Sequence, residues 1–248
     1  MGLSRRALLK QTGAVVAALG LTDLAMTGLN TKAKAYGQAL ANSSGRKLAL
    51  LVGIDKYAAG ALPPDQSSQI AGAATDVAMQ KALLIYRFGF LPKDILCLTN
   101  EQATRTGIYQ AFVDHLYEQA KPGDAVVFHF SGYGAQVRVA DLQGGQSTVR
   151  SLVPHDGLLP SETRPALNDL SEIELKTLLK LLKTKNVTTV LDAGFVDLSV
   201  PLSGGLRSRT RSAIATGLPP APFPLLTKPA SSTRERSFSG CAFARRSG

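Results

Sequence analysis

The chain has 248 residues, of which 44% are apolar and 19% charged, and it is long enough to bury a sizeable core. Its formal net charge of +10 is confined to the ends. Residues 1–41 carry +4, residues 202–248 carry +7, and residues 42–201 hold 15 basic and 16 acidic side chains. Because the middle is nearly neutral, we expect no nucleic-acid partner. Cys97 and Cys241 fit neither a disulfide framework nor a metal-ligand spacing, so we expect no metal and no cofactor.

The N-terminal segment resembles an export signal. The letters SRRALLK over residues 4–10 have the twin-arginine pattern, and a mildly apolar run and a small-x-small cleavage site at residues 39–41 follow. The apolar run, residues 12–21, is about half the ~20 residues that a spanning helix needs, so we expect no permanent membrane span after cleavage. The prediction is export to a periplasm or a thylakoid lumen. The alternative is a basic amphipathic N-terminus of a cytosolic protein.

The middle of the chain alternates short apolar runs with helical periodicity. Strands are predicted over residues 47–54, 94–98, 125–130 and 186–192, and helices over 69–88, 108–116 and 173–182. Ser171 and Glu174 form a capping box at the last helix. This order predicts an α/β fold with a mostly parallel sheet and helices on both faces. The stretch between the third strand and the last helix is interpreted as irregular.

Chemistry in such sheets lies at the carboxyl ends of the strands. Here these ends are the letters SGYG over residues 131–134 and DAG over residues 192–194, which we expect to face one crevice. Past residue 202 the chain is rich in Pro, Ser and Arg without periodicity, which indicates a linker or disorder. The predicted division is therefore a signal over 1–41, a domain over 42–201 and a basic tail over 202–248.

Five segments in order resemble the metacaspases, in particular the bacterial members called orthocaspases, from about residue 47 to 200. The segments are LVGIDKY (51–57), ATR (103–105), GDAVVF (123–128), SGYG (131–134) and VLDAG (190–194). The resemblance implies a caspase-like three-layer fold and a cysteine endopeptidase ancestry with Arg/Lys specificity. The family's fold adds two more strands near its C-terminus, and no convincing strand pair is found after residue 205.

The same resemblance places Tyr133 where the family has its catalytic histidine and Gly194 where it has its cysteine. A cysteine protease needs a thiolate and a nearby imidazole that moves a proton near neutral pH. Gly194 has no side chain to attack with, and tyrosine, with an ordinary pKa of ~10, is a poor base at pH 7. The resemblance therefore implies a non-cleaving relative with no intact catalytic dyad.

A substitute dyad would need another cysteine or histidine of this chain. Cys97 lies in an apolar strand, where a cysteine is ordinarily a small buried hydrophobe. His115 and His129 are expected to be structural or surface residues, and His155 lies in a loop of unknown orientation. Cys241, in the irregular tail, is a weaker candidate.

The family's specificity pocket survives in sequence. The resemblance places Asp76, Ser131 and Asp192 at its positions, and two carboxylates with a hydroxyl suit a guanidinium. The alternative is that Asp76 is a solvated helix residue and that Ser131 and Asp192 cap nearby backbone groups. The region where relatives bind calcium retains Asp141 alone, too few carboxylates for a tight site.

Three functions remain open at this point. The first is a pseudoprotease that binds Arg- or Lys-containing segments through Asp76 and Asp192. The second is an active endopeptidase with an unconventional mechanism. The third is a non-catalytic scaffold, in which an exposed sheet edge or the basic tail engages a protein partner.

Overall fold

The computed structural model describes residues 45–140, 146–161, 163, 168–195, 209–211, 215–216 and 223, all within the compact unit Ser43–Gly248. The export signal predicted over residues 1–41 lies outside the described residues, so it stays a prediction. Within the described ranges, no helix combines the length and apolarity needed to cross a membrane.

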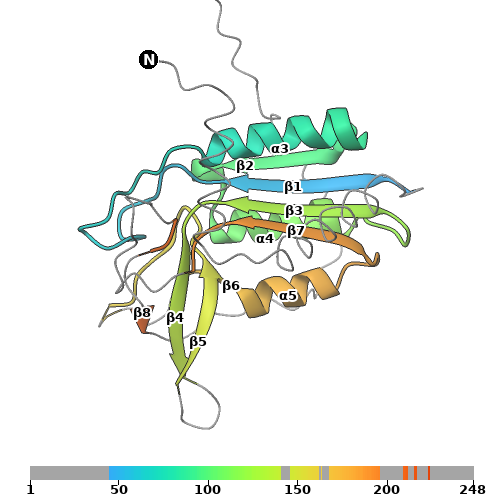
Figure 1. Ribbon diagram of the computed structural model, residues 1–248. Coiled ribbons are helices and arrows are strands. Elements are labelled where there is room, and N and C mark those ends of the chain that lie inside the picture. The colour runs from blue at the N-terminus through green and yellow to red at the C-terminus, as the bar shows by residue number, and fades with distance from the viewer. Residues whose placement is uncertain are drawn as a thin grey trace, which may run out of the picture. The chain divides into compact units, whose positions relative to one another are not determined.

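A parallel four-stranded sheet forms the centre of this unit (Figure 1). Its strands are β1 (Lys47–Gly53), β2 (Ile95–Thr99), β3 (Ala125–Ser131) and β7 (Asn186–Asp192), in the order β2-β1-β3-β7. β3 is buried along its whole length and β1 in all but its first residue, as expected for continuous apolar runs covered on both faces. The predicted strands are confirmed, with ends shifted by one residue at most.

Helices cover both faces of this sheet. One face packs on α3 (Ala73–Phe88). On the other, alternate residues of β1 and β3 share a core with α4 (Arg105–Ala111), its π-helical continuation η3 (Phe112–Tyr117) and α5 (Glu172–Lys180). This is the three-layer α/β arrangement expected of a caspase-like domain. Two short 3₁₀ turns flank β2, η1 (Pro92–Asp94) and η2 (Asn100–Gln102).

The helix boundaries have local causes. α3 begins four residues later than predicted because the Asp55 carboxylate accepts the main-chain N–H groups of Ala73 (2.7 Å) and Ala74 (3.2 Å) at its first turn. It ends at Gly89, which adopts the left-handed conformation (φ 68°) that favours glycine. The predicted capping box of Ser171 and Glu174 is present at α5.

A second sheet corrects the prediction of an irregular stretch after β3. β4 (Gly134–Ala140) and β5 (Gln146–Leu152) pair as an antiparallel hairpin, flanked by β6 (Leu170–Ser171) and β8 (Ala215–Thr216). In β4 the apolar residues Ala135, Val137 and Val139 alternate with polar ones, and the register pairs Val137 with Val149 of β5, both of which are buried.

The prediction of a linker or disorder after residue 202 is likewise wrong for the described part of that segment. β8 pairs in parallel with β4, and Thr210 forms a parallel bridge with Gly134. The edge of β4 offers main-chain N–H and C=O groups, and Thr210 and β8 pair with it there.

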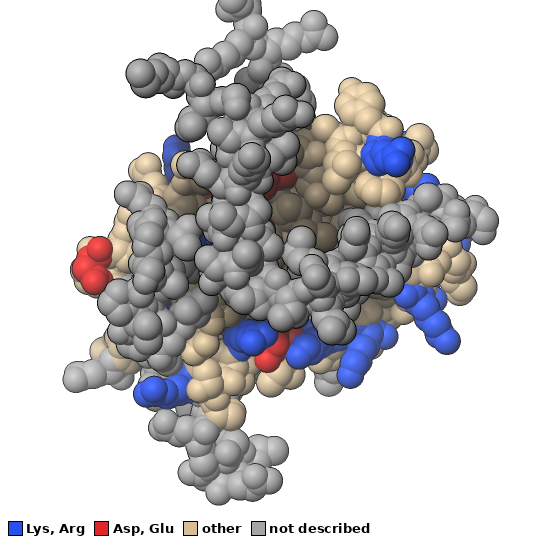
Figure 2. All heavy atoms as spheres, viewed as in Figure 1, with Lys and Arg blue, Asp and Glu red and all other residues tan. Residues whose placement is uncertain are grey.

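Exposed lysines follow α5 and the loop after it, namely Lys176, Lys180, Lys183 and Lys185. Figure 2 shows Lys and Arg side chains along this edge of the molecule. These cations therefore lie on the helical layer opposite α3.

Candidate functional site

The guanidinium of Arg209 is bound at the carboxyl end of the central sheet. Its Nη1 donates to Asp76 Oδ2 (2.8 Å), Ser131 Oγ (2.5 Å) and Asp192 Oδ2 (2.6 Å). Ser131 Oγ in turn donates to Asp76 Oδ2 at 2.8 Å. The structure thus brings together all three residues that the family resemblance assigns to a specificity pocket, and the chain's own arginine lies between them.

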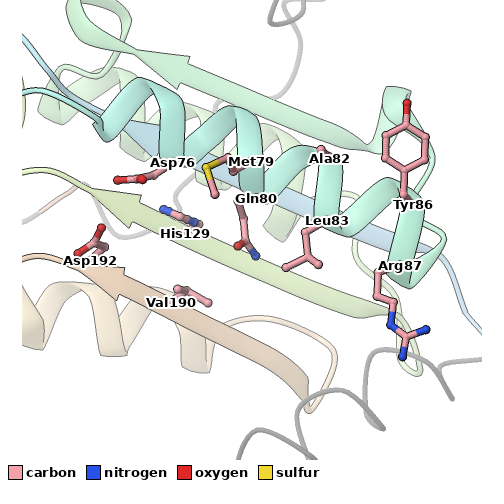
Figure 3. A pocket seen from close by; sticks show the side chains of 10 residues that line it. All are labelled: Asp76, Met79, Gln80, Ala82, Leu83, Tyr86, Arg87, His129, Val190 and Asp192. Atoms are coloured by element: carbon pink, nitrogen blue, oxygen red, sulfur yellow. The ribbon is translucent and has the colours of Figure 1, made fainter. Parts of the chain in front are cut away.

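Strand register and helix position explain this convergence. Ser131 and Asp192 are the last residues of β3 and β7 and are register partners, so their side chains leave the sheet side by side. Asp76 lies in the first turn of α3 above them. Figure 3 shows Asp76 of α3 and Asp192 of β7 on either side of the pocket, with His129 of β3 between them.

The charged side chains in this pocket stabilise one another's ionised forms. Burial raises the pKa of Asp76, but hydrogen bonds from Arg209 and Ser131 outweigh it and hold the pKa below its ordinary value. Burial lowers the pKa of Arg209, and Asp76 and Asp192 outweigh it in the other direction. The Asp76–Arg209 pair is therefore ionised at neutral pH. The pocket is partly open, since the Arg209 side chain is 24% exposed and that of Asp192 is 56% exposed.

A glycine leaves room for the guanidinium. Gly72, at the N-cap of α3, has φ 109°, in the region that side chains rarely adopt. A Cβ there would lie 3.1 Å from Arg209 Nη2. The position therefore favours glycine both for its backbone conformation and for the space beside Arg209.

Main-chain groups bind the residues around Arg209 as an extended strand. The N–H groups of Gly134 and Gly194 both donate to the carbonyl oxygen of Arg209, each at 2.8 Å. Arg211 N donates to Gly134 O at 2.7 Å, and Gln66 Nε2 donates to Thr210 O at 2.9 Å. The two loops that follow β3 and β7 therefore meet at one carbonyl group, as expected for a shared crevice.

Tyr133 and Gly194 lie at this crevice without a thiol or an imidazole. Tyr133 is 5% exposed, its ring lies 5.2 Å from the ring of Tyr57, and its hydroxyl donates to Ser67 O at 3.3 Å. Its main-chain N–H donates to Tyr57 Oη at 2.7 Å, and burial raises the pKa of Tyr57 above its ordinary value. Gly194 contributes its main-chain N–H alone.

No substitute dyad forms from Cys97 and His129. Cys97 of β2 and His129 of β3 are both register partners of Leu51, on opposite sides of β1. Two strand spacings of ~4.8 Å separate them, which is too far for a thiol–imidazole hydrogen bond. Cys97 is buried, as predicted. Cys241 lies outside the described residues.

The three histidines have different surroundings. His115 is buried, with Nε2 3.1 Å from Asp94 O, and burial lowers its pKa. His155 Nδ1 lies 2.8 Å from Lys56 O. His129 is 4% exposed, and within the described part of the chain neither of its ring nitrogens has a hydrogen-bond partner. Burial lowers the pKa of His129 to about 4, and the charge of Asp76 offsets this only in part.

An open groove of about 810 Å³ continues from the pocket along α3 and over β3 and β7 (Figure 3). Its lining is mostly apolar, and it includes Met79 and Tyr86, which are 65% and 88% exposed. The full lining consists of Asp76, Met79, Gln80, Ala82, Leu83, Tyr86, Arg87, His129, Val190 and Asp192.

A second carboxylate site binds the next arginine, Arg211, two residues further along the chain. Arg211 Nη1 and Nη2 donate to the two oxygens of Asp169 at 3.0 and 2.6 Å, and Ser151 Oγ donates to Asp169 Oδ2 at 2.7 Å. The side chains of Arg211 and Asp169 are 0% and 2% exposed. Sequence reasoning missed this pair. Alternating arginines at positions 207, 209 and 211, a period typical of an extended strand, are the signal that could have indicated it.

The described ranges contain no cluster of three or more His, Cys, Asp or Glu side chains that could hold a metal ion. Asp141 lies outside these ranges.

Comparison with known proteins identifies the kind of domain that carries this site. The family model described as "Metacaspase, peptidase C14 domain" matches residues 47–202. Metacaspase-1 of Meyerozyma guilliermondii is 32% identical over 133 residues, which cover 49% of this chain and 30% of that protein. Metacaspase-1 of Ajellomyces capsulatus is 31% identical over 117 residues, 45% of this chain and 30% of that protein. The chain thus matches less than a third of the length of these relatives.

Among solved structures, a crystal structure of a protein from Geobacter sulfurreducens has a TM-score of 0.47 and 18% identity. It covers 62% of this chain and 52% of its own.

Proposed function

The chain belongs to the metacaspase family, and from that premise we propose that it is a non-cleaving member that binds arginine-containing segments in the pocket of Asp76, Ser131 and Asp192. The observation that carries the proposal is Arg209, whose guanidinium contacts all three side chains. Charge-assisted hydrogen bonds to two carboxylates are the interaction that distinguishes a cation from other side chains.

The absence of cleavage follows from the residues at the crevice. Gly134 and Gly194 donate to the Arg209 carbonyl as donors to a scissile carbonyl would, which keeps the carbonyl polarised. A covalent step needs a nucleophile near this carbon, and Gly194 has none to offer. Loss of the nucleophile in a cysteine or serine protease costs on the order of 10⁶ in turnover. The peptide bond after Arg209 is then a bound ligand rather than a substrate.

Peptide binding tests the first part of this proposal. Because Arg209 fills the pocket in cis, an Arg209→Ala variant should bind an Arg-containing peptide more tightly than the wild type does, measured by isothermal titration calorimetry. Adding Asp76→Asn to that variant should abolish the binding. The matched control adds Glu172→Gln, a carboxylate on α5 whose side chain is 37% exposed, to the Arg209→Ala variant and should leave the binding unchanged. Equal affinity of all four proteins would contradict the proposal.

Fluorogenic Arg and Lys substrates test the second part. The purified wild type and the Arg209→Ala variant should release no fluorophore above the buffer rate. Turnover that disappears on Tyr133→Phe would instead favour an endopeptidase with an unconventional mechanism.

We also propose that residues 1–41 direct export by the twin-arginine route. The supporting observation is the pattern at Arg5 and Arg6, followed by the short apolar run. Replacing both arginines with lysine should retain the protein in the cytoplasm of a bacterial host, as fractionation would show. Equal export of wild type and variant would contradict this.

A further inference from the structure

Arg209 and Arg211 lie on one extended stretch of chain, two residues apart, and each guanidinium enters its own carboxylate site. The second site is built of buried groups: Asp169 is 2% exposed at its side chain, and Ser151, which donates to it, is 2% exposed. Asp169 contacts both terminal nitrogens of Arg211, the two-pronged geometry that suits arginine and not lysine.

The residue between the arginines is also specified. Thr210 is 1% exposed, and its carbonyl accepts from Gln66 Nε2. The main-chain groups of Gly134 and Gly194 also bind this stretch, and these hydrogen bonds do not depend on side chains. Recognition of a strand in this way takes affinity from main-chain bonds and specificity from side-chain sites.

We propose that the site recognises a strand of the form arginine–small residue–arginine, with Asp76, Ser131 and Asp192 binding the first arginine and Asp169 with Ser151 binding the second. This rests on the proposed function and narrows its ligand from a basic segment to a two-arginine one. Residues 209–211 of the chain are the built-in occupant, so an external strand competes with them for both sites.

Vacating both sites tests the proposal. The full-length Arg209→Ala/Arg211→Ala variant is titrated with the blocked peptides Arg-Thr-Arg and Arg-Thr-Ala. The peptide with two arginines should bind about tenfold more tightly or better, as expected for a charge-assisted hydrogen-bonded pair. Adding Asp169→Asn should remove this gain and leave the affinity for Arg-Thr-Ala unchanged.

The single Arg209→Ala variant is the matched control, because Arg211 still fills the second site. There the two peptides should bind equally. Equal affinity in the double variant would overturn the two-arginine proposal and leave the proposed function standing. Failure of both peptides to bind the double variant while it is folded would overturn both.

A double variant that is unfolded alone is assayed by refolding with each peptide, followed by circular dichroism and thermal melting. Arg-Thr-Arg should restore the native transition at a concentration about tenfold lower than Arg-Thr-Ala does. Equal restoration by the two peptides, or restoration by neither, would contradict the proposal.

Discussion

The two arginine sites use the same chemistry in opposite surroundings. Arg209 meets two carboxylates in a pocket whose Asp192 side chain is 56% exposed, whereas Arg211 meets one carboxylate where both side chains are at most 2% exposed. Water screens the first pair and not the second, so ion pairs of similar length have different consequences. The open site is suited to exchange its occupant readily, and the closed one to exchange it slowly. Exposure, and not the number of carboxylates, separates the two.

The largest expected effect is at the closed site. Asp169→Ala leaves the Arg211 guanidinium buried without its counter-ion, which should lower the free energy of unfolding by about 3–5 kcal/mol. Urea denaturation followed by circular dichroism measures this. A loss no greater than that of Asp192→Ala would remove the distinction between the sites.

The next largest effect is a loss of folding stability at low pH, caused by protonation of His129 beside the open site. Its folded-state pKa of about 4 lies below the ordinary value of 6.5, so folding favours the neutral ring. This contribution is fully present above pH 6.5 and is lost as the pH falls toward 4, by up to about 3 kcal/mol. His129→Leu should flatten the stability profile in that window, leaving the smaller part due to His115. His155→Gln is the control, and a profile unchanged by His129→Leu would contradict the assignment.

Substitution of Gly72 by alanine tests whether the guanidinium of Arg209 needs the space that this glycine leaves. Both Gly72 and Gly123 have positive φ, 109° and 91°, so alanine at either should cost about 1–3 kcal/mol of backbone strain. A Cβ at Gly72 also approaches Arg209 Nη2, whereas nothing lies within 4 Å of one at Gly123. Gly72→Ala should therefore lower the melting temperature more than Gly123→Ala does. Equal shifts would show that the guanidinium yields freely.

The smallest expected effect is at the exposed wall of the open pocket. Asp192→Ala should change the free energy of unfolding by about 0–1 kcal/mol, because solvent screens the pair and Asp76 with Ser131 still binds Arg209. Thermal melting at low and high salt measures this. A loss comparable to that of Asp169→Ala would mean that the two sites do not differ as their exposure indicates.

Sequence periodicity was sufficient for the central sheet and insufficient for its attachments. β1 and β3 are continuous apolar runs buried on both faces, and no competing pattern obscures them. The β4–β5 hairpin was missed because the Gly and Gln residues between Ala140 and Gln146 favoured a loop interpretation over the alternation in β4 around Val137. Hairpin alternation is a weaker signal when one face is exposed.

The pocket residues could likewise be predicted from the sequence, whereas the arginine that occupies the pocket could not. Asp76, Ser131 and Asp192 could be placed because the resemblance assigns each to a strand end or helix turn, and parallel register then brings two of them together. Arg209 could not, because its position depends on bonds to Gly134 and Gly194, far away in sequence. The same holds for Arg211, whose partner Asp169 lies outside every predicted element.

The close approach of the two loops at Gly134 has a practical consequence. A Cβ at Gly134 would lie 2.2 Å from the Gly194 carbonyl oxygen and 2.8 Å from the Phe195 ring, so the two loops approach this closely only because residue 134 has no side chain. Alanine at this one position would push the loops apart by steric clash while changing no charge. Such a variant would weaken the main-chain hydrogen bonds to residues 209–211 without changing the carboxylates that bind Arg209 and Arg211.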